Sequence, residues 1–128
     1  MRWAIAATAL VILDEVIKWT ALRDGWAVHK NFGIAFDIAI PSVVMIPLIA
    51  AIVGTAGYFY WQHRLEARIA APLAFVIAGG LGNLFDRVHW GFIVDYIIIY
   101  TSAFNISDLM ILGGAIALVS LRRPPHVV

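Results

Sequence analysis

Four long apolar stretches dominate the pattern of hydrophobic and polar positions along this chain. A helix that crosses the hydrocarbon core of a membrane needs about 20 largely apolar residues, and residues 3–22, 42–61, 67–85 and 104–121 each come close to that length. Together they occupy most of the chain. The pattern therefore predicts an all-α membrane protein with four transmembrane helices, folded as a single domain over residues 1–128.

Two of the connections between these helices have a different pattern. In residues 33–40, isoleucines and Phe36 alternate with Ala35, Asp37 and Ala39, which is the period of a β-strand. Residues 92–101 are rich in β-branched and aromatic side chains but are too short to span a membrane. We expect a small extended or β element on the outer face, where backbone groups can reach water or each other.

The basic residues predict an orientation, because cytoplasmic segments carry an excess of Lys and Arg. One side of the predicted bundle has Arg2, Arg64, Arg68, Arg122 and Arg123, whereas the other has Arg23, Lys30 and Arg87. Tryptophans near both sets of helix ends agree with membrane interfaces at these levels. Both termini are therefore expected in the cytoplasm, with the extended segments outside.

Composition supports a membrane environment and excludes several classes of function. The chain is 62% hydrophobic and 13% charged, with a mean hydropathy of +0.90, whereas soluble domains carry about 25% charged residues. The net charge of +1 and the scattered basic residues argue against a nucleic-acid partner. There is no cysteine, and the four histidines lack the close spacing of a zinc helix, so we expect neither a metal nor a cofactor.

The first apolar stretch resembles a cleavable secretory signal in one respect, since it follows a basic residue, Arg2. It continues past Asp14 and Lys18 to Leu22 without a plausible cleavage site. We therefore expect it to be retained as the first helix.

Ionisable side chains within the apolar stretches are the candidate functional residues. A charge at membrane depth is costly, so such a residue normally faces the bundle interior and marks a functional site. Asp14 and Lys18 are four residues apart with the acid first, which is the favourable order for an intrahelical ion pair. Mutual neutralisation during membrane insertion would explain this pair without any further function. Glu15 points about 100° away from Asp14 and has no evident partner nearby in the sequence.

Residues 79–87, at the end of the third stretch, combine several glycines with Asn83, Asp86 and Arg87. Such glycines most often allow close helix packing, and an adjacent Asp and Arg can form an anchoring pair. The spacing does not match a phosphate-binding loop, and no strand precedes it. Local sequence therefore predicts an ionised Asp86 beside Arg87.

Asp95 and Asp108 differ from Asp86 because neither has an adjacent cation. Asp95 lies within the extended apolar run, and Asp108 falls in the first turn of the fourth predicted helix. Two carboxyl groups that share one proton can activate water for proteolysis: the ionised member takes a proton from water while its protonated partner polarises the scissile carbonyl. The residue pattern leaves open whether the two side chains meet.

Five short motifs occur in order along the chain. They are Asp14-Glu-Val-Ile-Lys18, Asn31-Phe-Gly33-Ile-Ala35-Phe36, Gly82-Asn83-Leu-Phe-Asp86-Arg87, Gly91-Phe-Ile-Val-Asp95-Tyr96 and Phe104-Asn105-Ile-Ser-Asp108. As a set they resemble the motifs of the lipoprotein signal peptidase (signal peptidase II) family. Five ordered motifs are far more specific than any one of them.

The resemblance implies an intramembrane aspartyl endopeptidase that removes signal peptides from diacylglyceryl-modified prolipoproteins, cutting just before the lipidated cysteine. By position it implies Asp95 and Asp108 as the catalytic pair, with substrate-binding or supporting roles for Asn31, Asn83, Arg87, Asn105, Asp14, Lys18 and Asp86. It also implies the bacterial cytoplasmic (inner) membrane, with the site toward the outer, periplasmic face. The expected partners are diacylated prolipoproteins and membrane lipid, and we expect a monomer.

The chain departs from the family pattern at three positions near the predicted site. Glu15 replaces the usual Gln, Ser107 replaces Ala, and Tyr96 replaces Phe. We expect the first two to alter substrate fit. Only twelve residues separate Asp95 from Asp108, so an outer-loop element of the family is shortened here, which bears on substrate gating.

Two other classes of function fit the same residues. Intramembrane acids beside a lysine also occur in proton or cation pathways, and polar residues can simply hold helices together in a structural subunit. Cleavage of a lipidated precursor that depends on Asp95 and Asp108 would separate the peptidase from both.

Overall fold

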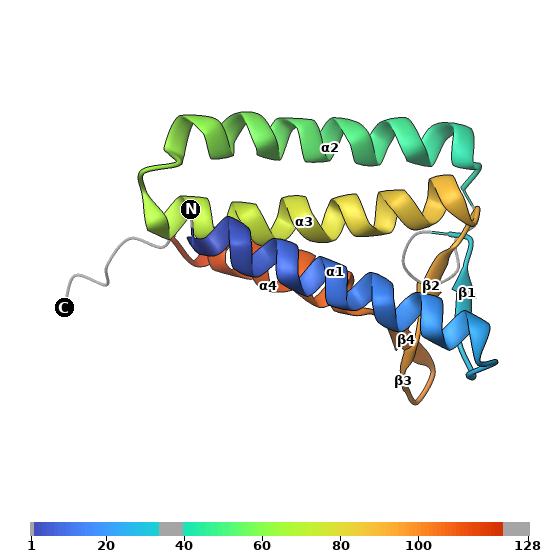
Figure 1. Cartoon of the computed structure of the whole chain (residues 1–128). Coiled ribbons are helices and arrows are strands. Elements are labelled where there is room, and N and C mark those ends of the chain that lie inside the picture. The colour runs from blue at the N-terminus through green and yellow to red at the C-terminus, as the bar shows by residue number, and fades with distance from the viewer. Residues whose placement is uncertain (1, 34–39, 122–128) are drawn as a thin grey trace.

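The computed structural model describes residues 2–33 and 40–121, and this part of the chain forms a helix bundle with short strands at one end (Figure 1). The helices are α1 (Arg2–Arg23), α2 (Ser42–His63), α3 (Ala67–His89) and α4 (Ile106–Leu121). The strands are β1 (His29–Asn31), β2 (Ile93–Asp95), β3 (Ile97–Ile99) and β4 (Ser102–Phe104). Each of the four predicted helical stretches is confirmed to within about one helical turn at its ends.

Two of these helices, α2 and α3, are long and apolar enough to cross a membrane, and α4 is a shorter apolar helix. The second half of α1 instead contains Asp14, Glu15 and Lys18. These charges lower its mean hydropathy, although Asp14 and Lys18 are fully buried. A mostly helical fold with small β elements is therefore established, and the count of four membrane-spanning helices remains a prediction.

Helix α3 is central, since it packs against α1, α2 and α4. Glycines allow the closest approaches: a Cβ at Gly79 would lie 2.5 Å from the carbonyl oxygen of Ser107, as the sequence predicted for residues 79–87, and one at Gly114 would lie 2.6 Å from that of Pro72. A small apolar cluster of Ala7, Ala74, Ala78 and Met110 joins α1, α3 and α4. Small residues thus bring the backbone of α4 against α3.

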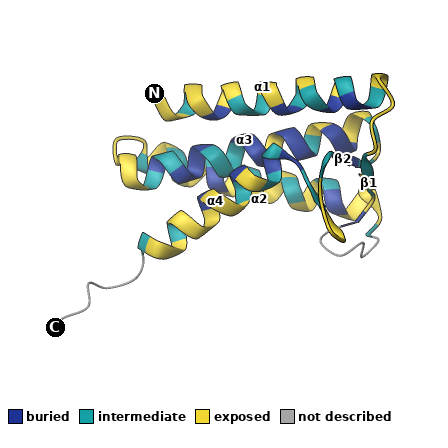
Figure 2. Ribbon diagram, turned by 90° about the horizontal axis from the view of Figure 1, so that it is seen from below, coloured by how far each residue is buried: buried dark blue, intermediate teal, exposed yellow. Residues whose placement is uncertain are grey.

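The outward faces of the helices are apolar, whereas ionisable groups lie inside the bundle. Val43, Trp61 and Val119 are among the large apolar side chains that are more than half exposed, and Figure 2 shows exposed positions along α1 and α4, whereas most of α3 is buried or half-buried. Asp14, Lys18 and Asp86 are fully buried. This distribution suits hydrocarbon as the surrounding solvent, because contiguous apolar surface of this extent is rare on soluble monomers.

All four strands lie at one end of the bundle, opposite the end where α1 begins and α4 stops (Figure 1). β1 pairs antiparallel with β2, which places His29 opposite Asp95. β3 and β4 form a second antiparallel pair, in which Ile97 faces Phe104 and Tyr100 stands in the turn with a φ of 53°. We call residues 97–104 the hairpin.

The predicted extended element is therefore confirmed for the run that contains Asp95. Most of the other predicted segment, residues 33–40, lies outside the described residues. The strand that pairs with β2 is His29–Asn31, which sequence periodicity did not indicate. Its three residues are polar and too few for an alternating pattern, so pairing with β2 gives it its extended form.

Candidate active site

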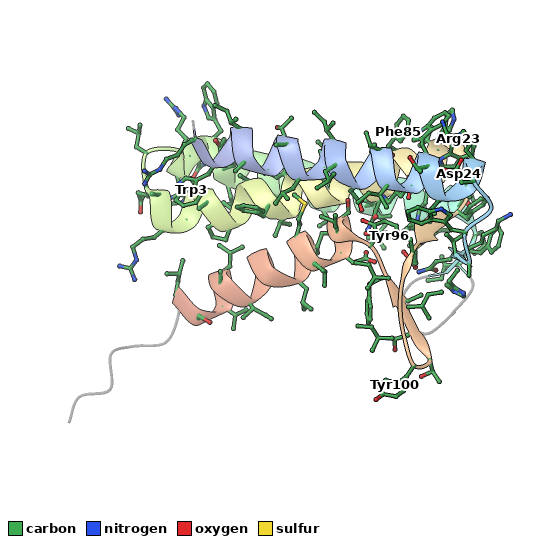
Figure 3. The ribbon with its side chains drawn as sticks, turned by 60° about the horizontal axis from the view of Figure 1, so that its bottom comes forward. Trp3, Arg23, Asp24, Phe85, Tyr96 and Tyr100 are labelled. Atoms are coloured by element: carbon green, nitrogen blue, oxygen red, sulfur yellow. The ribbon has the colours of Figure 1, made fainter. Side chains whose placement is uncertain are left out.

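A cavity of about 640 Å³ opens among the strands and the start of α4. Its lining includes both Asp95 and Asp108, together with His29 and Asn31 from β1 and most of the hairpin. Figure 3 shows the hairpin extending beyond the helices, with Tyr96 near its base and Tyr100 at its tip. The structure thus brings into one cavity two acids that are separated by twelve residues in the sequence.

Asp95 ends strand β2 and is only 1% exposed. The side-chain amide of Asn31 donates a hydrogen bond to its Oδ2 at 3.2 Å, and that of Asn105 donates to its Oδ1 at 2.8 Å. Burial, and next the charge of Asp108, raise the pKa of Asp95 to about 7, against the smaller opposing effects of Asn31 and His29. Asp95 therefore holds a proton over much of the range in which an ordinary aspartate is ionised.

Asp108 lies in the first turn of α4 and forms a reciprocal helix cap with Asn105. The Asp108 backbone N–H donates to Asn105 Oδ1 at 2.8 Å, while the Asn105 backbone N–H donates to Asp108 Oδ2 at 3.2 Å. This arrangement is that of a capping box, with Asn at the N-cap and an acid three residues later. The other carboxylate oxygen, Oδ1, accepts a hydrogen bond of 2.7 Å from the side chain of Asn83.

Asn105 links the surroundings of the two acids. Its side-chain NH₂ group lies within hydrogen-bonding distance of Asp95 Oδ1 at 2.8 Å and of Asn83 Oδ1 at 3.2 Å. Its side-chain oxygen accepts the hydrogen bond from the Asp108 backbone N–H. The side chain is fully buried, and Asn83 is 6% exposed. The predicted site asparagines Asn31, Asn83 and Asn105 therefore all contact one or both acids.

A buried cluster of charges lies next to this site. Lys18 Nζ lies 2.8 Å from Asp14 Oδ2, 2.9 Å from Asp86 Oδ2 and 3.1 Å from Glu15 Oε1. The predicted Asp14–Lys18 pair is confirmed. The prediction that Asp86 is ionised beside Arg87 as its pair is wrong, because Asp86 contacts Lys18; Glu15, for which the sequence showed no evident nearby partner, also contacts Lys18.

Adjacent residues of a helix point about 100° apart, so Asp86 and Arg87 face different neighbours. Asp86 faces α1 and also accepts a hydrogen bond of 3.1 Å from the backbone N–H of Val94 in β2. Arg87, which is 3% exposed, donates to the carbonyl oxygen of Gly33, just after β1. Each side chain therefore holds a different strand against α3.

From the sequence, Tyr96 was noted only as a departure from the family pattern, and Ser107 was expected only to alter substrate fit. The hydroxyl groups of both residues donate to the carboxylate of Asp14, at 2.6 Å in each case. Neither residue lines the cavity, so any effect of Ser107 on substrate fit would be indirect, and that expectation stays a prediction. His29 was also missed, although it lies opposite Asp95 and lines the cavity.

These features define a helical membrane protein with two acids, the buried Asp95 and the partly exposed Asp108, in one cavity at one end of its bundle. A family model described as signal peptidase (SPase) II matches residues 6–122. The chain therefore belongs to the signal peptidase II family, as the ordered motifs indicated.

Individual proteins agree with this assignment. The chain is 30% identical over 130 residues to a lipoprotein signal peptidase of Clostridium novyi (strain NT), covering 84% of this chain and 88% of the relative. It is 36% identical over 145 residues to a lipoprotein signal peptidase of Pseudomonas syringae pv. tomato, covering 92% and 83%. A solved bacterial membrane enzyme has a similar fold, with a TM-score of 0.80 at 23% identity over 94% of this chain and 92% of that chain.

Proposed function

We propose that this chain is an aspartyl endopeptidase of the bacterial inner membrane, which removes signal peptides from diacylglyceryl-modified prolipoproteins by cutting just before the lipidated cysteine. Membership of the signal peptidase II family supports the peptidase activity and the class of substrate. The observation that carries the mechanism is the meeting of Asp95 and Asp108 in one cavity, joined through Asn105. The reaction proposed here needs no metal or cofactor.

In this proposal the two acids take different roles because their surroundings differ. Asp95 holds its proton up to about pH 7, since burial and the charge of Asp108 raise its pKa to about 7. Asp108 accepts hydrogen bonds from Asn83 and from the Asn105 backbone, at the helix N-terminus, where a negative charge is favoured. Asp108 is therefore the base and Asp95 the acid.

The reaction then follows the general course of water-activating aspartyl proteolysis. Asp108 takes a proton from a water molecule, and the oxygen of that water attacks the scissile carbonyl carbon. Asp95 donates a hydrogen bond to the carbonyl oxygen, on which negative charge develops. The tetrahedral intermediate collapses with cleavage of the C–N bond, and the proton held by Asp108 passes to the leaving amine.

The proposed supporting residues act by holding these two groups in place. Asn31 and Asn105 orient Asp95, whereas Asn83 and Asn105 orient Asp108. Arg87 holds the end of β1 through Gly33, and Asp14, Lys18 and Asp86 support the site from α1 and α3. Such fixed geometry matters because a displacement of about 1 Å in a catalytic group can lower a rate about 100-fold.

The position of the cavity suits a lipid-anchored substrate. It opens at the end of the bundle, beside helices whose outer faces are apolar. A prolipoprotein held in the membrane by its acyl chains would present the peptide bond next to its lipidated cysteine near this level. We propose that this end faces outward, that both termini are cytoplasmic and that a single chain, forming one domain, is sufficient for cleavage.

Replacement of each acid by its amide tests the proposal. We expect Asp95→Asn and Asp108→Asn each to lower the rate of cleavage of a diacylglyceryl-modified lipobox peptide by about 1,000-fold or more. Asp24→Asn is the matched control, because Asp24 is an exposed acid that pairs with Arg23. Thermal unfolding in detergent checks that each variant is folded. Cleavage by either active-site variant at the rate of the control would show that the proposal is wrong.

A further inference from the structure

The carboxylate of Asp14 accepts an unusual number of short hydrogen bonds. Its Oδ1 accepts from the Tyr96 hydroxyl at 2.6 Å and from the Ile106 backbone N–H at 2.9 Å. Its Oδ2 accepts from the Ser107 hydroxyl at 2.6 Å and lies 2.8 Å from Lys18 Nζ. Asp14 is fully buried, and hydrogen bonds to a buried charge are among the stronger ones in proteins.

These donors flank the two acids of the proposed dyad. Tyr96 directly follows Asp95, while Ile106 and Ser107 directly precede Asp108. The hairpin starts at Ile97 and ends at Phe104, and these two residues form its last pair. Asp14 and the Tyr96 hydroxyl therefore join the two chain segments at the base of the hairpin, where the Ile106 N–H also lies 3.3 Å from the Tyr96 oxygen.

A second contact holds the other side of Asp95. The backbone N–H of Val94 donates to Asp86, which shares Lys18 with Asp14. Asp95 thus lies between an anchor at Val94 and an anchor at Tyr96, and Lys18 connects both anchors. The backbone on each side of Asp95 is fixed to the buried charges of α1 and α3.

We propose that the hydroxyl groups of Tyr96 and Ser107 are positioning groups, which act through Asp14 to close the base of the hairpin and hold Asp95 and Asp108 at their working separation. This inference rests on the proposed function. The Phe and Ala of the family pattern at these positions carry no hydroxyl group. We call the two hydrogen bonds from the Tyr96 and Ser107 hydroxyls to Asp14 the tether. It is therefore a feature of this chain, in which only twelve residues connect Asp95 to Asp108.

The surroundings of Tyr96 keep its hydroxyl group protonated, so that it can donate a hydrogen bond to Asp14. Burial, and next the hydrogen bond to Asp14, raise the pKa of the Tyr96 phenol above its ordinary value. The phenol therefore remains protonated, and able to donate to Asp14, throughout the range in which a peptidase of this kind would act. Because neither hydroxyl lines the cavity, their loss should change the rate of the chemical step rather than substrate binding.

Two conservative substitutions test this inference. We expect Tyr96→Phe to lower kcat for a diacylglyceryl-modified lipobox peptide by about tenfold, as for loss of one hydrogen bond to a charged group, with KM changed by less than about twofold. Ser107→Ala should act in the same direction. Because both hydroxyls serve one carboxylate, the effects of the double substitution should not be additive.

Matched controls are available for both substitutions. Tyr58 is an exposed tyrosine of α2, and the hydroxyl of the exposed Ser120 donates to the carbonyl oxygen of Ile116 within its own helix. Tyr58→Phe and Ser120→Ala should leave kcat and KM unchanged. If Tyr96→Phe has the kcat of Tyr58→Phe, or if it raises KM at unchanged kcat, the inference is overturned.

Amide hydrogen exchange measures the tether without any cleavage assay. We expect faster exchange in the hairpin and at Ile106 in Tyr96→Phe but not in Tyr58→Phe. Unchanged exchange in the hairpin would also overturn the inference. If the wild-type chain does not cleave the peptide, or if Asp95→Asn still cleaves it, the proposed function fails, and the exchange comparison still decides whether the tether exists.

Discussion

The proton on Asp95 determines how the proposed reaction should depend on pH. The folded-state pKa of Asp95 is about 7, whereas that of an unfolded aspartate is about 3.9. As pH rises through about 7 Asp95 loses its proton, so the proposed acid can no longer polarise the scissile carbonyl. We expect kcat/KM to fall as pH rises through about 7 and to approach a tenfold decrease per pH unit above it.

The same pKa difference has a consequence for stability. Between about pH 4 and pH 7 folded Asp95 holds a proton that the unfolded chain has lost, so the free energy of unfolding should decrease as pH rises through this range. Asp95→Asn should remove this contribution. Rate profiles and thermal unfolding from pH 4 to pH 9 measure both effects, and a rate that stays level above pH 8 would contradict the assignment of the acid.

Lys18 gives a second prediction for single residues. Replacement by Met would leave Asp14 and Asp86 buried without their shared cation, and breaking a buried ion pair in this way costs about 3–5 kcal/mol. We expect Lys18→Met to lower the thermal unfolding temperature strongly and to abolish cleavage. Arg23→Met is the control, since the pair of Arg23 with Asp24 is exposed and should contribute little. Equal unfolding temperatures for the two variants would contradict this role for Lys18.

The ion pair of Asp14 and Lys18 within one helix could be predicted from sequence, although the contact of Glu15 with the same lysine was missed, and contacts between helices could not be predicted. The spacing of Asp14 and Lys18 indicated their ion pair directly. The contact of Lys18 with Asp86 depends on how α1 lies against α3, which no local pattern encodes. Adjacency suggested instead that Asp86 pairs with Arg87, and that inference failed because neighbouring helical residues diverge.

At the scale of secondary-structure elements, the packing of α4 against α3 sets the position of Asp108. A methyl group at Gly79 would lie 2.5 Å from the carbonyl oxygen of Ser107, directly before Asp108, and the backbone must shift to admit it. We expect Gly79→Ala to destabilise the protein by about 1–3 kcal/mol and to reduce cleavage, because the start of α4 moves away from Asp95.

The control for this prediction is Gly57→Ala in α2, where an added Cβ meets nothing within 4 Å. Alanine is favoured over glycine in a helix interior by about 1 kcal/mol, so this variant should be as stable as the wild type or more stable. The Gly79→Ala and Gly57→Ala variants are compared by their thermal unfolding temperatures and cleavage rates in the same detergent. A Gly79→Ala variant that unfolds and cleaves like Gly57→Ala would show that close packing at Gly79 does not position Asp108.

The elements differ in how far sequence could predict them. The helices followed from long apolar stretches, a signal that needs no knowledge of their neighbours. Strand β2 was expected from its β-branched residues, but its partner β1 was not, since His29–Asn31 is polar and becomes extended by pairing with β2. The family motifs identified all three asparagines around the acids, while the roles of Tyr96 and Ser107 required the position of Asp14 between two distant segments.

At the scale of the whole molecule, the bundle has two chemically different ends. One end carries the strands, the cavity and both acids of the proposed dyad, while α1 begins and α4 stops at the other (Figure 1). Arg2, Arg64 and Arg68 belong to the second end, and Arg23, Lys30 and Arg87 to the first. In the sequence, Arg122 and Arg123 follow α4, which stops at the second end. Counted with them, five arginines stand against three basic residues at the first end, which predicts that the second end is cytoplasmic.

Single cysteines can test this orientation, because the chain has none of its own. Asp24 follows α1 at the strand end and its side chain is 43% exposed, whereas Leu65 is 92% exposed in the turn between α2 and α3 at the opposite end. In intact cells whose outer membrane has been permeabilised, a membrane-impermeant maleimide should label Asp24→Cys but not Leu65→Cys. Lysis should make Leu65→Cys reactive as well. The reverse pattern would place the cavity in the cytoplasm, where a prolipoprotein exported across the inner membrane could not present its lipidated cysteine to Asp95 and Asp108.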